Sequence, residues 1–257
     1  MFLDKRSPPS PERIISLVPS QTELLYHLGL ENETTGITKF CVHPEQWFRT
    51  KTRIGGTKQL DIKKIISLQP DLIIANKEEN VKEQIEELAE KFPVWLTDVN
   101  SYEEALLMIK DVSRISGKNE NGINLIEDIK EKFDSLKDEM IPACYLIWKD
   151  PYMTVGGDTF ISDMMKLGGF QNVFSYQKRY PEVSVEKIHE SGCKLILLSS
   201  EPFPFKEKHA EELKAKLPGI KIIIADGEMF SWYGSRMLLA PAYFQQLRNV
   251  VNALTDV

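Results

Sequence analysis

The sequence predicts an α/β protein built as two lobes of parallel β-sheet that a single long helix joins. Short apolar runs alternate with amphipathic helical patterns in both halves of the chain, which is typical of βαβ units. Residues 119–140 interrupt this alternation with one long helical pattern. A helix–strand pattern at residues 62–74 also aligns without a gap with residues 185–197, which supports two related lobes.

The first half opens with a buried strand and a helix. Ile14–Val18 is a continuous apolar run, and the helical pattern of Gln21–Leu28 stops at Gly29, a residue that commonly ends helices. Asp61 is placed to cap the next helix, and Pro70 separates that helix from the following strand. The other predicted elements of this half are strands at Thr35–Thr38, Leu72–Ala75 and Val94–Leu96 and helices at Ile62–Ser67, Val81–Lys91 and Ser101–Ile115.

The long helical pattern at residues 119–140 predicts one helix of about 21 residues, which would span about 30 Å. Its apolar side chains recur at helical spacing, and its other faces are charged. Such a helix can serve as a strut between two lobes, and an ordinary amphipathic surface helix is the alternative. We therefore place an N-terminal lobe at residues 1–117, a connecting helix at 118–141 and a C-terminal lobe at 142–257.

The strand and helix patterns begin again after Pro142. The run Leu195–Leu198 is apolar throughout, as in a strand that is covered on both faces. The other predicted elements of this half are strands at Ala143–Trp148, Met153–Val155 and Ile220–Ala225 and helices at Phe160–Leu167, Ser184–His189, His209–Lys216 and Arg236–Leu254.

Composition excludes several classes of protein. The formal net charge of −6 and the pI of about 5.4 argue against nucleic acid as a partner. Cys41, Cys144 and Cys193 show neither a disulfide framework nor zinc-site spacing. No apolar run reaches the ~18 residues of a membrane helix. Residues 1–13 are polar and rich in proline, without the apolar core of a signal peptide, so we expect a cytoplasmic protein unless a signal was removed.

Catalytic motifs are missing from the sequence. It contains no GxSxG, P-loop, HExxH or GxGxxG pattern, so we expect a binding protein with no catalytic residue and no intrinsic cofactor or metal. His43 beside Cys41 is the one candidate metal ligand, because side chains two residues apart in an extended segment point the same way. A metal site would need further ligands, and an ordinary loop histidine is the favoured interpretation.

Aromatic residues gather at strand ends and in predicted loops. Phe40 and Trp47 follow the second strand, and Trp148 and Tyr152 flank the first strand of the second half. The segment Phe230–Tyr233 carries three aromatic residues in a predicted loop. Ligands of open α/β sheets bind outside the carboxyl ends of the strands, and pockets are commonly lined by aromatic side chains. These residues are therefore candidates for ligand contact, with core packing as the alternative.

Several motifs in this order resemble one known family. They are SLVPSQTEL at Ser16–Leu24, DIKKIISLQPDLIIA at Asp61–Ala75, VSVEKI at Val183–Ile188 and FSWYGSRMLLA at Phe230–Ala240. The chain resembles the class III periplasmic solute-binding proteins, the helical-backbone metal receptors that carry vitamin B12, haem and iron-siderophore complexes to ABC importers. The resemblance implies a monomer of two Rossmann-like lobes in the periplasm or cell envelope. Its ligand, cobalamin-like before haem or ferric siderophore, would lie in the cleft between the lobes.

The resemblance also implies individual ligand-binding residues. Phe40 matches a pocket tyrosine of the vitamin B12 binders, whereas Thr57 and Asn76 stand where those proteins carry tryptophans. The two departures remove flat surfaces that would stack on a corrin-type macrocycle. The other positions that the resemblance turns toward the ligand are Ser20, Thr38, Gly56, Trp148, Phe160, Phe230, Trp232 and Tyr233.

Docking on a permease is the second property that the resemblance implies. Family members dock with one glutamate per lobe against arginines, and Glu186 matches the glutamate of the second lobe. Lys63 occupies the corresponding position of the first lobe, and a lysine would repel an arginine there. Asp61, the nearest acid, is offset from that position by two residues. The alternatives are therefore a cytoplasmic corrinoid-handling protein or enzyme-like derivative on the same scaffold, and a protein-interaction module.

Overall fold

The computed structural model describes residues 10–134, 136 and 140–253, which form two compact units. Unit 1 combines Met1–Val99, Glu103–Asp128 and Tyr233–Arg236, and unit 2 combines Asn100–Tyr102, Ile129–Trp232 and Met237–Val257. The chain passes from unit 1 to unit 2 inside helix α6 (Asn119–Asp134), after Asp128. The predicted two-lobed α/β fold is confirmed, while the exact lobe boundaries given above stay a prediction.

Unit 1 is built on a five-stranded sheet of order β3-β2-β1-β4-β5 in which neighbouring strands are parallel. Ile15 lies opposite Ile73, and Ser16 lies opposite Ile74, in the central β1–β4 pair. Because the strands are parallel, their carboxyl ends lie at one edge, called here the unit 1 edge. The strands are β1 (Ile14–Ser16), β2 (Thr34–Ile37), β3 (Thr52–Arg53), β4 (Leu72–Asn76) and β5 (Val94–Thr97).

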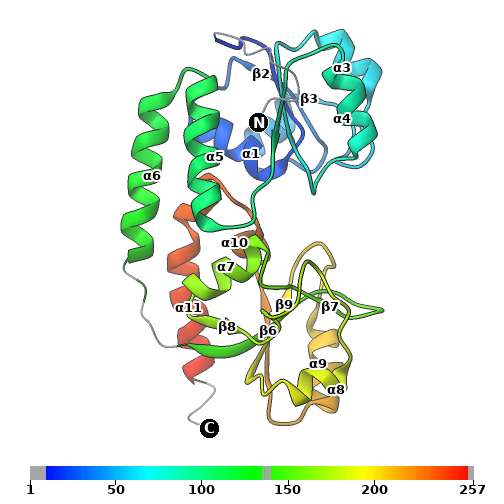
Figure 1. Cartoon of the computed structure of the whole chain (residues 1–257), viewed down its shortest axis with the longest axis vertical. Helices are drawn as coiled ribbons and strands as arrows, with labels where there is room; N and C mark the ends of the chain where they lie inside the picture. The colour runs from blue at the N-terminus through cyan, green and yellow to red at the C-terminus, as the bar shows by residue number, and fades with distance from the viewer. Residues whose placement is uncertain (1–9, 135, 137–139, 254–257) are drawn as a thin grey trace. The chain divides into compact units, whose positions relative to one another are not determined.

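Helices cover both faces of this sheet. Ile65, Ile85 and Leu88 pack with Ile15 and Ile73, so α3 and α4 cover one face, and α1 lies on the other side (Figure 1). The helices of the unit are α1 (Pro19–His27), α2 (Glu45–Thr50), α3 (Ile62–Leu68), α4 (Lys82–Ala89) and α5 (Tyr102–Ile115). The predicted cap of α3 is confirmed, since the Asp61 carboxylate accepts a hydrogen bond from the Lys64 amide at 3.0 Å.

Unit 2 has a five-stranded sheet of order β10-β9-β6-β7, with β8 paired to β6. Its strands are β6 (Ile141–Trp148), β7 (Met153–Thr154), β8 (Phe170–Asn172), β9 (Leu195–Ser199) and β10 (Lys221–Ala225). Pairs β6–β9 and β9–β10 are parallel as predicted, and the unexpected strand β8 is also parallel to β6, but β7 is antiparallel to β6. A short turn joins β6 directly to β7, and a parallel partner would need a much longer crossover. The carboxyl ends of β6, β9 and β10 form the unit 2 edge.

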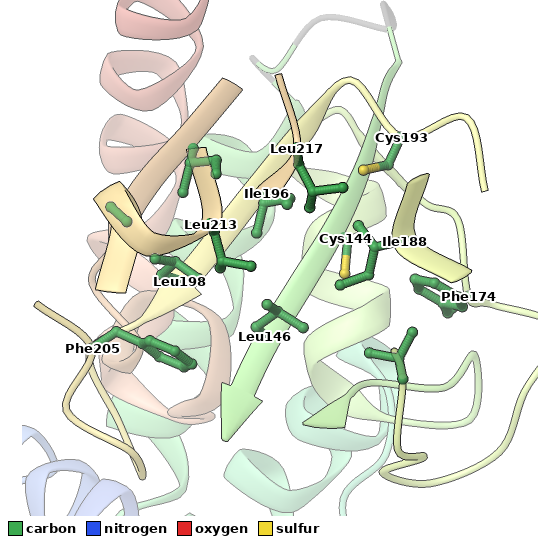
Figure 2. Packing of buried hydrophobic residues seen from close by; sticks show 13 residues of the cluster. Cys144, Leu146, Phe174, Ile188, Cys193, Ile196, Leu198, Phe205, Leu213 and Leu217 are labelled. Atoms are coloured by element: carbon green, nitrogen blue, oxygen red, sulfur yellow. The ribbon is translucent and has the colours of Figure 1, made fainter. Parts of the chain in front are cut away.

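One face of the unit 2 sheet is covered by α8 (Val185–Glu190) and α9 (Glu207–Lys216). Figure 2 shows Leu146 and Ile196 of the sheet among Leu213 of α9 and Ile188 of α8 in one buried cluster. The other helices of this unit are α7 (Phe160–Leu167), α10 (Glu228–Ser231) and α11 (Ala240–Ala253). A 3-10 turn at Ser235–Leu238 begins in unit 1 and ends in unit 2. Leu146, Ile196, Leu213 and Ile188 are fully buried, so this cluster fixes the sheet beneath the unit 2 edge.

The helix–strand repeat predicted from the sequence has structural counterparts in the two units. Helix α8 begins at Ser184, whose hydroxyl accepts from the Lys187 amide at 3.3 Å, as Asp61 caps α3. The aligned residues Ile65 and Ile188 are both fully buried. So are the aligned strand residues Leu72, Ile73 and Ile74 in β4 and Leu195, Ile196 and Leu197 in β9.

Three predicted elements differ from the structure. Helix α6 ends at Asp134, and Met140 is not helical; residues 135 and 137–139 lie outside the described residues. The residue before Pro142 is disfavoured in a helix and instead starts β6. The predicted helix Arg236–Leu254 is a 3-10 turn followed by α11, because Pro241 suits the first turn of a new helix; Leu254 is not described. The predicted loop at Phe230–Tyr233 overlaps the short helix α10.

Four elements were not expected from the sequence: α2, β3, β8 and α10. Each has six residues or fewer, too short for a clear periodic pattern. In the described part of the chain, no helix has the length and apolar character needed to span a lipid bilayer.

Candidate functional site

The unit 1 edge presents an exposed aromatic ring. Phe40, just beyond β2, is 50% exposed, and its amide donates to the Thr38 hydroxyl at 3.3 Å. The Lys39 ammonium lies 5.1 Å from the centre of this ring. A Cβ atom added to Gly56 would lie 3.1 Å from Phe40 Cε2, so the ring rests on backbone that carries no side chain. The predicted residues Thr38, Phe40 and Gly56 are thus brought together.

A chain of hydroxyl groups and one thiol holds the loops beside Phe40. The Thr22 hydroxyl lies 2.8 Å from the Ser16 hydroxyl and 3.1 Å from Cys41 Sγ, which is itself 3.2 Å from the Thr38 hydroxyl. Burial raises the pKa of the Cys41 thiol, although its hydrogen bonds with Thr22 and Thr38 act in the opposite direction. The thiol is therefore neutral at physiological pH and ties β1, α1 and the β2 loop together.

His43 and Cys41 gain no further metal-binding residues from the fold. Within residues 10–134, 136 and 140–253, no group of three or more His, Cys, Asp and Glu side chains is arranged to hold a metal ion. All three cysteines are buried free thiols.

Neutral amides and hydroxyls link the remaining strand ends of unit 1. Gln21 donates from Nε2 to the Thr97 hydroxyl at 2.6 Å, and that hydroxyl donates to the Ala75 carbonyl at 2.9 Å. The Asn76 side chain accepts from the amides of Glu78 and Glu79, at 2.8 and 3.1 Å, and donates to Thr97. Asn76, which stands where the resemblance places a tryptophan, therefore caps the turn after β4. Thr57, the other such position, is 7% exposed.

Tyr233 and Arg236 belong to unit 1, far in sequence from the rest of it. Burial raises the pKa of the Tyr233 phenol, and hydrogen bonds with Gln21 and Ser20 partly oppose that rise. Arg236 forms a two-point ion pair with Glu23 of α1, with Nη2–Oε1 at 2.8 Å and Nε–Oε2 at 2.9 Å. The predicted residues Ser20 and Tyr233 therefore meet at the start of α1, a contact that sequence spacing could not reveal.

The unit 2 edge carries a different aromatic group. Trp148 at the end of β6 is 41% exposed, and its ring packs edge-on against Phe203 at 5.6 Å between centroids. Phe203 in turn contacts Phe205 at 4.8 Å and His209 at 5.3 Å. Phe203 and Phe205 were not predicted from the sequence. They lie in SEPFPF, shortly after the strand Leu195–Leu198, and an aromatic residue just beyond a strand is the same pattern that identified Phe40.

A partly buried carboxylate organises the rest of the unit 2 edge. Glu201 Oε1 accepts from the Ser231 hydroxyl at 2.7 Å and from the Trp232 indole at 2.9 Å. Burial raises the pKa of Glu201, the nearby charges of Glu228 and Asp226 raise it further, and its two hydrogen bonds lower it. The predicted residue Trp232 is 8% exposed and is oriented by this carboxylate. Glu201 was not singled out in the sequence, because its partners lie about 30 positions further on.

Phe160 and Phe230 differ from Phe40 and Trp148 in their exposure. Phe160, the first residue of α7, is 6% exposed. Phe230 is fully buried, with its ring 5.0 Å from Tyr145 and 4.7 Å from Phe244. These contacts favour core packing over ligand contact for Phe230. The ligand roles of the predicted residues otherwise stay predictions.

The two predicted docking positions occupy the first turns of matching helices. Glu186 lies in the first turn of α8 and is exposed, and hydrogen bonds from its own amide and from Ser184 lower the pKa of its carboxyl. Lys63 lies in the first turn of α3 and is also exposed. These two equivalent positions therefore carry opposite charges.

Comparisons with known proteins define the class. A family model described as "Periplasmic binding protein" matches residues 14–221, and the chain belongs to this family. A vitamin B12-binding protein of Vibrio campbellii (strain ATCC BAA-1116) is 29% identical over 185 residues, which cover 69% of this chain but only 66% of that protein. The vitamin B12-binding protein of Yersinia pseudotuberculosis serotype O:3 (strain YPIII) is 24% identical over 95% of this chain and 89% of its own length.

Solved structures share the fold. The periplasmic vitamin B12-binding protein BtuF of Vibrio cholerae has a TM-score of 0.75 at 22% identity, covering 94% of this chain and 99% of that one. The periplasmic haem-binding protein BhuT, solved with two haems, has a TM-score of 0.79 at 18% identity, covering 95% of this chain and 99% of its own. The predicted resemblance to class III periplasmic solute-binding proteins is thereby confirmed.

Proposed function

We propose that this protein is a solute-binding protein that holds a metal chelate or tetrapyrrole, with a cobalamin-like ligand favoured, and delivers it to an ABC importer. The observation that carries the proposal is the pair of exposed rings, Phe40 and Trp148, at the carboxyl edges of the two sheets. Exposed rings held by rigid loops provide apolar contact area at a low entropic cost of binding. The curated relatives, named vitamin B12-binding proteins, support the choice of ligand class.

The fixed geometry of the unit 1 edge supports binding without large rearrangement. Hydrogen bonds join the ends of β1, β2, β4 and β5 through Thr22, Gln21 and Thr97. A rigid edge loses little conformational entropy when a ligand binds. Haem and ferric siderophores are the other ligands within this class. Thr57 and Asn76 provide no flat stacking surface, so ring contacts of a cobalamin-like ligand with unit 1 would depend on Phe40.

A titration with single-ring variants tests the proposal. Cyanocobalamin absorbance and tryptophan quenching are measured for the wild-type protein, Phe40→Ala, Trp148→Ala and the control Tyr26→Ala. Tyr26 is 43% exposed but lies near the C-terminal end of α1, away from the unit 1 edge. Loss of a ligand-contacting ring should weaken binding about tenfold, a cost of about 1.4 kcal/mol. Equal affinities for all four proteins would refute ligand contact at these edges.

The second candidate is a corrinoid-handling protein that does not dock on a permease. Lys63 favours it, because a basic residue replaces the acid that family members use in that lobe. Localisation separates the two candidates: we propose the periplasm or cell envelope, whereas this second candidate requires the cytoplasm. Fractionation of native cells, with detection by antibody, decides between them.

A further inference from the structure

Asn80 connects three loops at the unit 1 edge. Its side chain is 6% exposed, and Nδ2 donates to the carbonyls of Leu17 at 3.3 Å and Thr57 at 3.1 Å. Its Oδ1 accepts from the Asn76 amide at 2.9 Å, and its own amide donates to the Asn76 carbonyl at 3.1 Å. The ends of β1 and β4 and the loop after β3 therefore meet on one side chain.

These three backbone contacts require an uncharged carboxamide. A single side chain must provide two N–H donors and one acceptor, and asparagine is the smallest residue that does so. An aspartate would keep the acceptor but place a negative oxygen against the carbonyls of Leu17 and Thr57. A serine would be too short and would offer only one donor.

The Thr57 contact connects Asn80 to the exposed ring of Phe40. Thr57 directly follows Gly56, and the ring lies against Gly56. Within the Gly56 turn, the Gly56 amide donates to the Gln59 carbonyl at 2.9 Å and the Gln59 amide donates to the Gly56 carbonyl at 3.2 Å. The Lys39 amide donates to the Gly55 carbonyl at 2.8 Å. The bond from Asn80 thus joins this turn to the carboxyl ends of the central strands β1 and β4.

We propose that Asn80 is a positioning residue for ligand binding: it holds the Gly56 turn, and through it the Phe40 ring, in the conformation that the ligand meets. The inference rests on the proposed function for its ligand, but it also makes a claim about loop order in the free protein. The entry to α1 is held in the same way, because Leu17 lies two residues before Pro19. Preorganisation of this kind raises affinity by lowering the entropic cost of binding.

Hydrogen exchange of the free protein tests the claim about order. Asn80→Asp should speed amide exchange together in residues 17–22, 55–60 and 76–80, and leave exchange in α5 unchanged. Asn172→Asp is the matched control, since Asn172 is also 6% exposed and its side chain donates to Val155 and Ser162 and accepts from Phe174. That control should speed exchange near residues 155–162 and 172–174 only. If Asn80→Asp fails to fold, Asn80→Ser serves in its place.

A double-mutant cycle with cyanocobalamin tests the route through Phe40. Asn80→Asp should weaken binding about tenfold in the wild-type protein and clearly less in the Phe40→Ala background, because coupled residues are not additive. Equal effects in both backgrounds, or unchanged exchange at residues 55–60, would overturn the proposal. If the wild-type protein binds no chelate, the proposed function fails, and the exchange result alone still decides whether Asn80 orders the loops.

Discussion

The edges of the two sheets share an architecture but are held by different chemistry. At the unit 1 edge, hydroxyls, one neutral thiol and neutral carboxamides connect the strand ends, with Asn80 and Thr22 at the branch points. At the unit 2 edge, the partly buried carboxylate of Glu201 holds Ser231 and Trp232. The same βαβ organisation therefore supports one edge whose order should be independent of pH and another whose order should depend on it.

The exposed aromatic rings of the two edges, Phe40 and Trp148, also have different supports. The Phe40 ring lies on the backbone of Gly56 with the Lys39 ammonium nearby, whereas the Trp148 ring packs against a group of rings that includes Phe203. The ring in unit 1 depends on the loop beneath it, and the ring in unit 2 depends on its aromatic neighbours.

The largest effect is expected from a methyl group added to Gly157. Its Cβ would lie 2.2 Å from the Ser175 carbonyl oxygen, and a backbone atom cannot move aside cheaply. Gly157→Ala should lower the free energy of unfolding by about 3 kcal/mol. The atoms nearest to the Cβ of Gly56→Ala would be side-chain atoms of Phe40 and Lys39, which can move, so this change should cost less than about 1 kcal/mol while moving the ring. Urea denaturation measures both.

Gly192→Ala is the control for this pair. Gly192 has a φ of +70°, and an added Cβ would meet nothing within 4 Å, so the change should cost only the left-handed strain of about 1 kcal/mol. If Gly157→Ala and Gly56→Ala lower the free energy of unfolding equally, the expected difference between backbone crowding at Gly157 and side-chain crowding at Gly56 is contradicted.

Glu201→Gln should separate the two edges by pH. The pKa of Glu201 is higher in the folded chain than the ordinary value of about 4.3. The folded chain therefore binds a proton at Glu201 more tightly than the unfolded chain does. The stability that this proton contributes is fully present below the ordinary pKa and is lost as pH rises through the pKa of the folded chain. Glutamine keeps an acceptor for Trp232 without the buried charge. The variant should melt at a higher temperature than wild type at pH 7 and show no such gain near pH 4.

The control for this prediction is Glu211→Gln. Glu211 is exposed, and its pKa is lowered, first by its hydrogen bond with Lys214. A carboxylate whose pKa is lowered by folding stabilises the folded chain in its charged form, so Glu211→Gln should not raise the melting temperature at pH 7. A destabilised Glu201→Gln protein at pH 7 would show that the carboxylate charge itself stabilises the unit 2 edge.

The smallest effect on folding is expected at the two exposed docking positions. Lys63→Glu and Glu186→Lys should each change the free energy of unfolding by less than about 0.5 kcal/mol, because neither side chain is buried. If the protein docks on a permease through acids on both units, Lys63→Glu should strengthen binding to membranes that contain the importer, and Glu186→Lys should weaken it. Weaker membrane binding by Lys63→Glu would instead show that the native lysine contributes to docking.

Local patterns predicted most of the fold. The apolar runs at Leu72–Ala75 and Leu195–Leu198 are buried strands because their residues suit a sheet covered on both faces. Asp61 marks the start of a helix because capping depends only on the next three residues. Patterns of this kind need no knowledge of distant contacts.

The candidate site was less predictable, because its contacts join residues far apart in sequence. The Arg236–Glu23 ion pair spans 213 positions, and the Asn80–Leu17 bond spans 63. The sequence singled out aromatic residues near strand ends as a group, yet it could not separate the exposed Phe40 from the fully buried Phe230. That difference depends on packing by Tyr145 and Phe244, which no local pattern contains.

Isothermal titration calorimetry of the wild-type protein tests the central claim most directly. Cyanocobalamin, cobinamide, haemin and a ferric hydroxamate siderophore are titrated separately into the purified protein at pH 7. We predict saturable binding of at least one of them with a Kd of about 1 μM or tighter, equivalent to about −8 kcal/mol. The absence of binding heat for all four at several temperatures would contradict the assignment of this protein as a carrier of metal chelates.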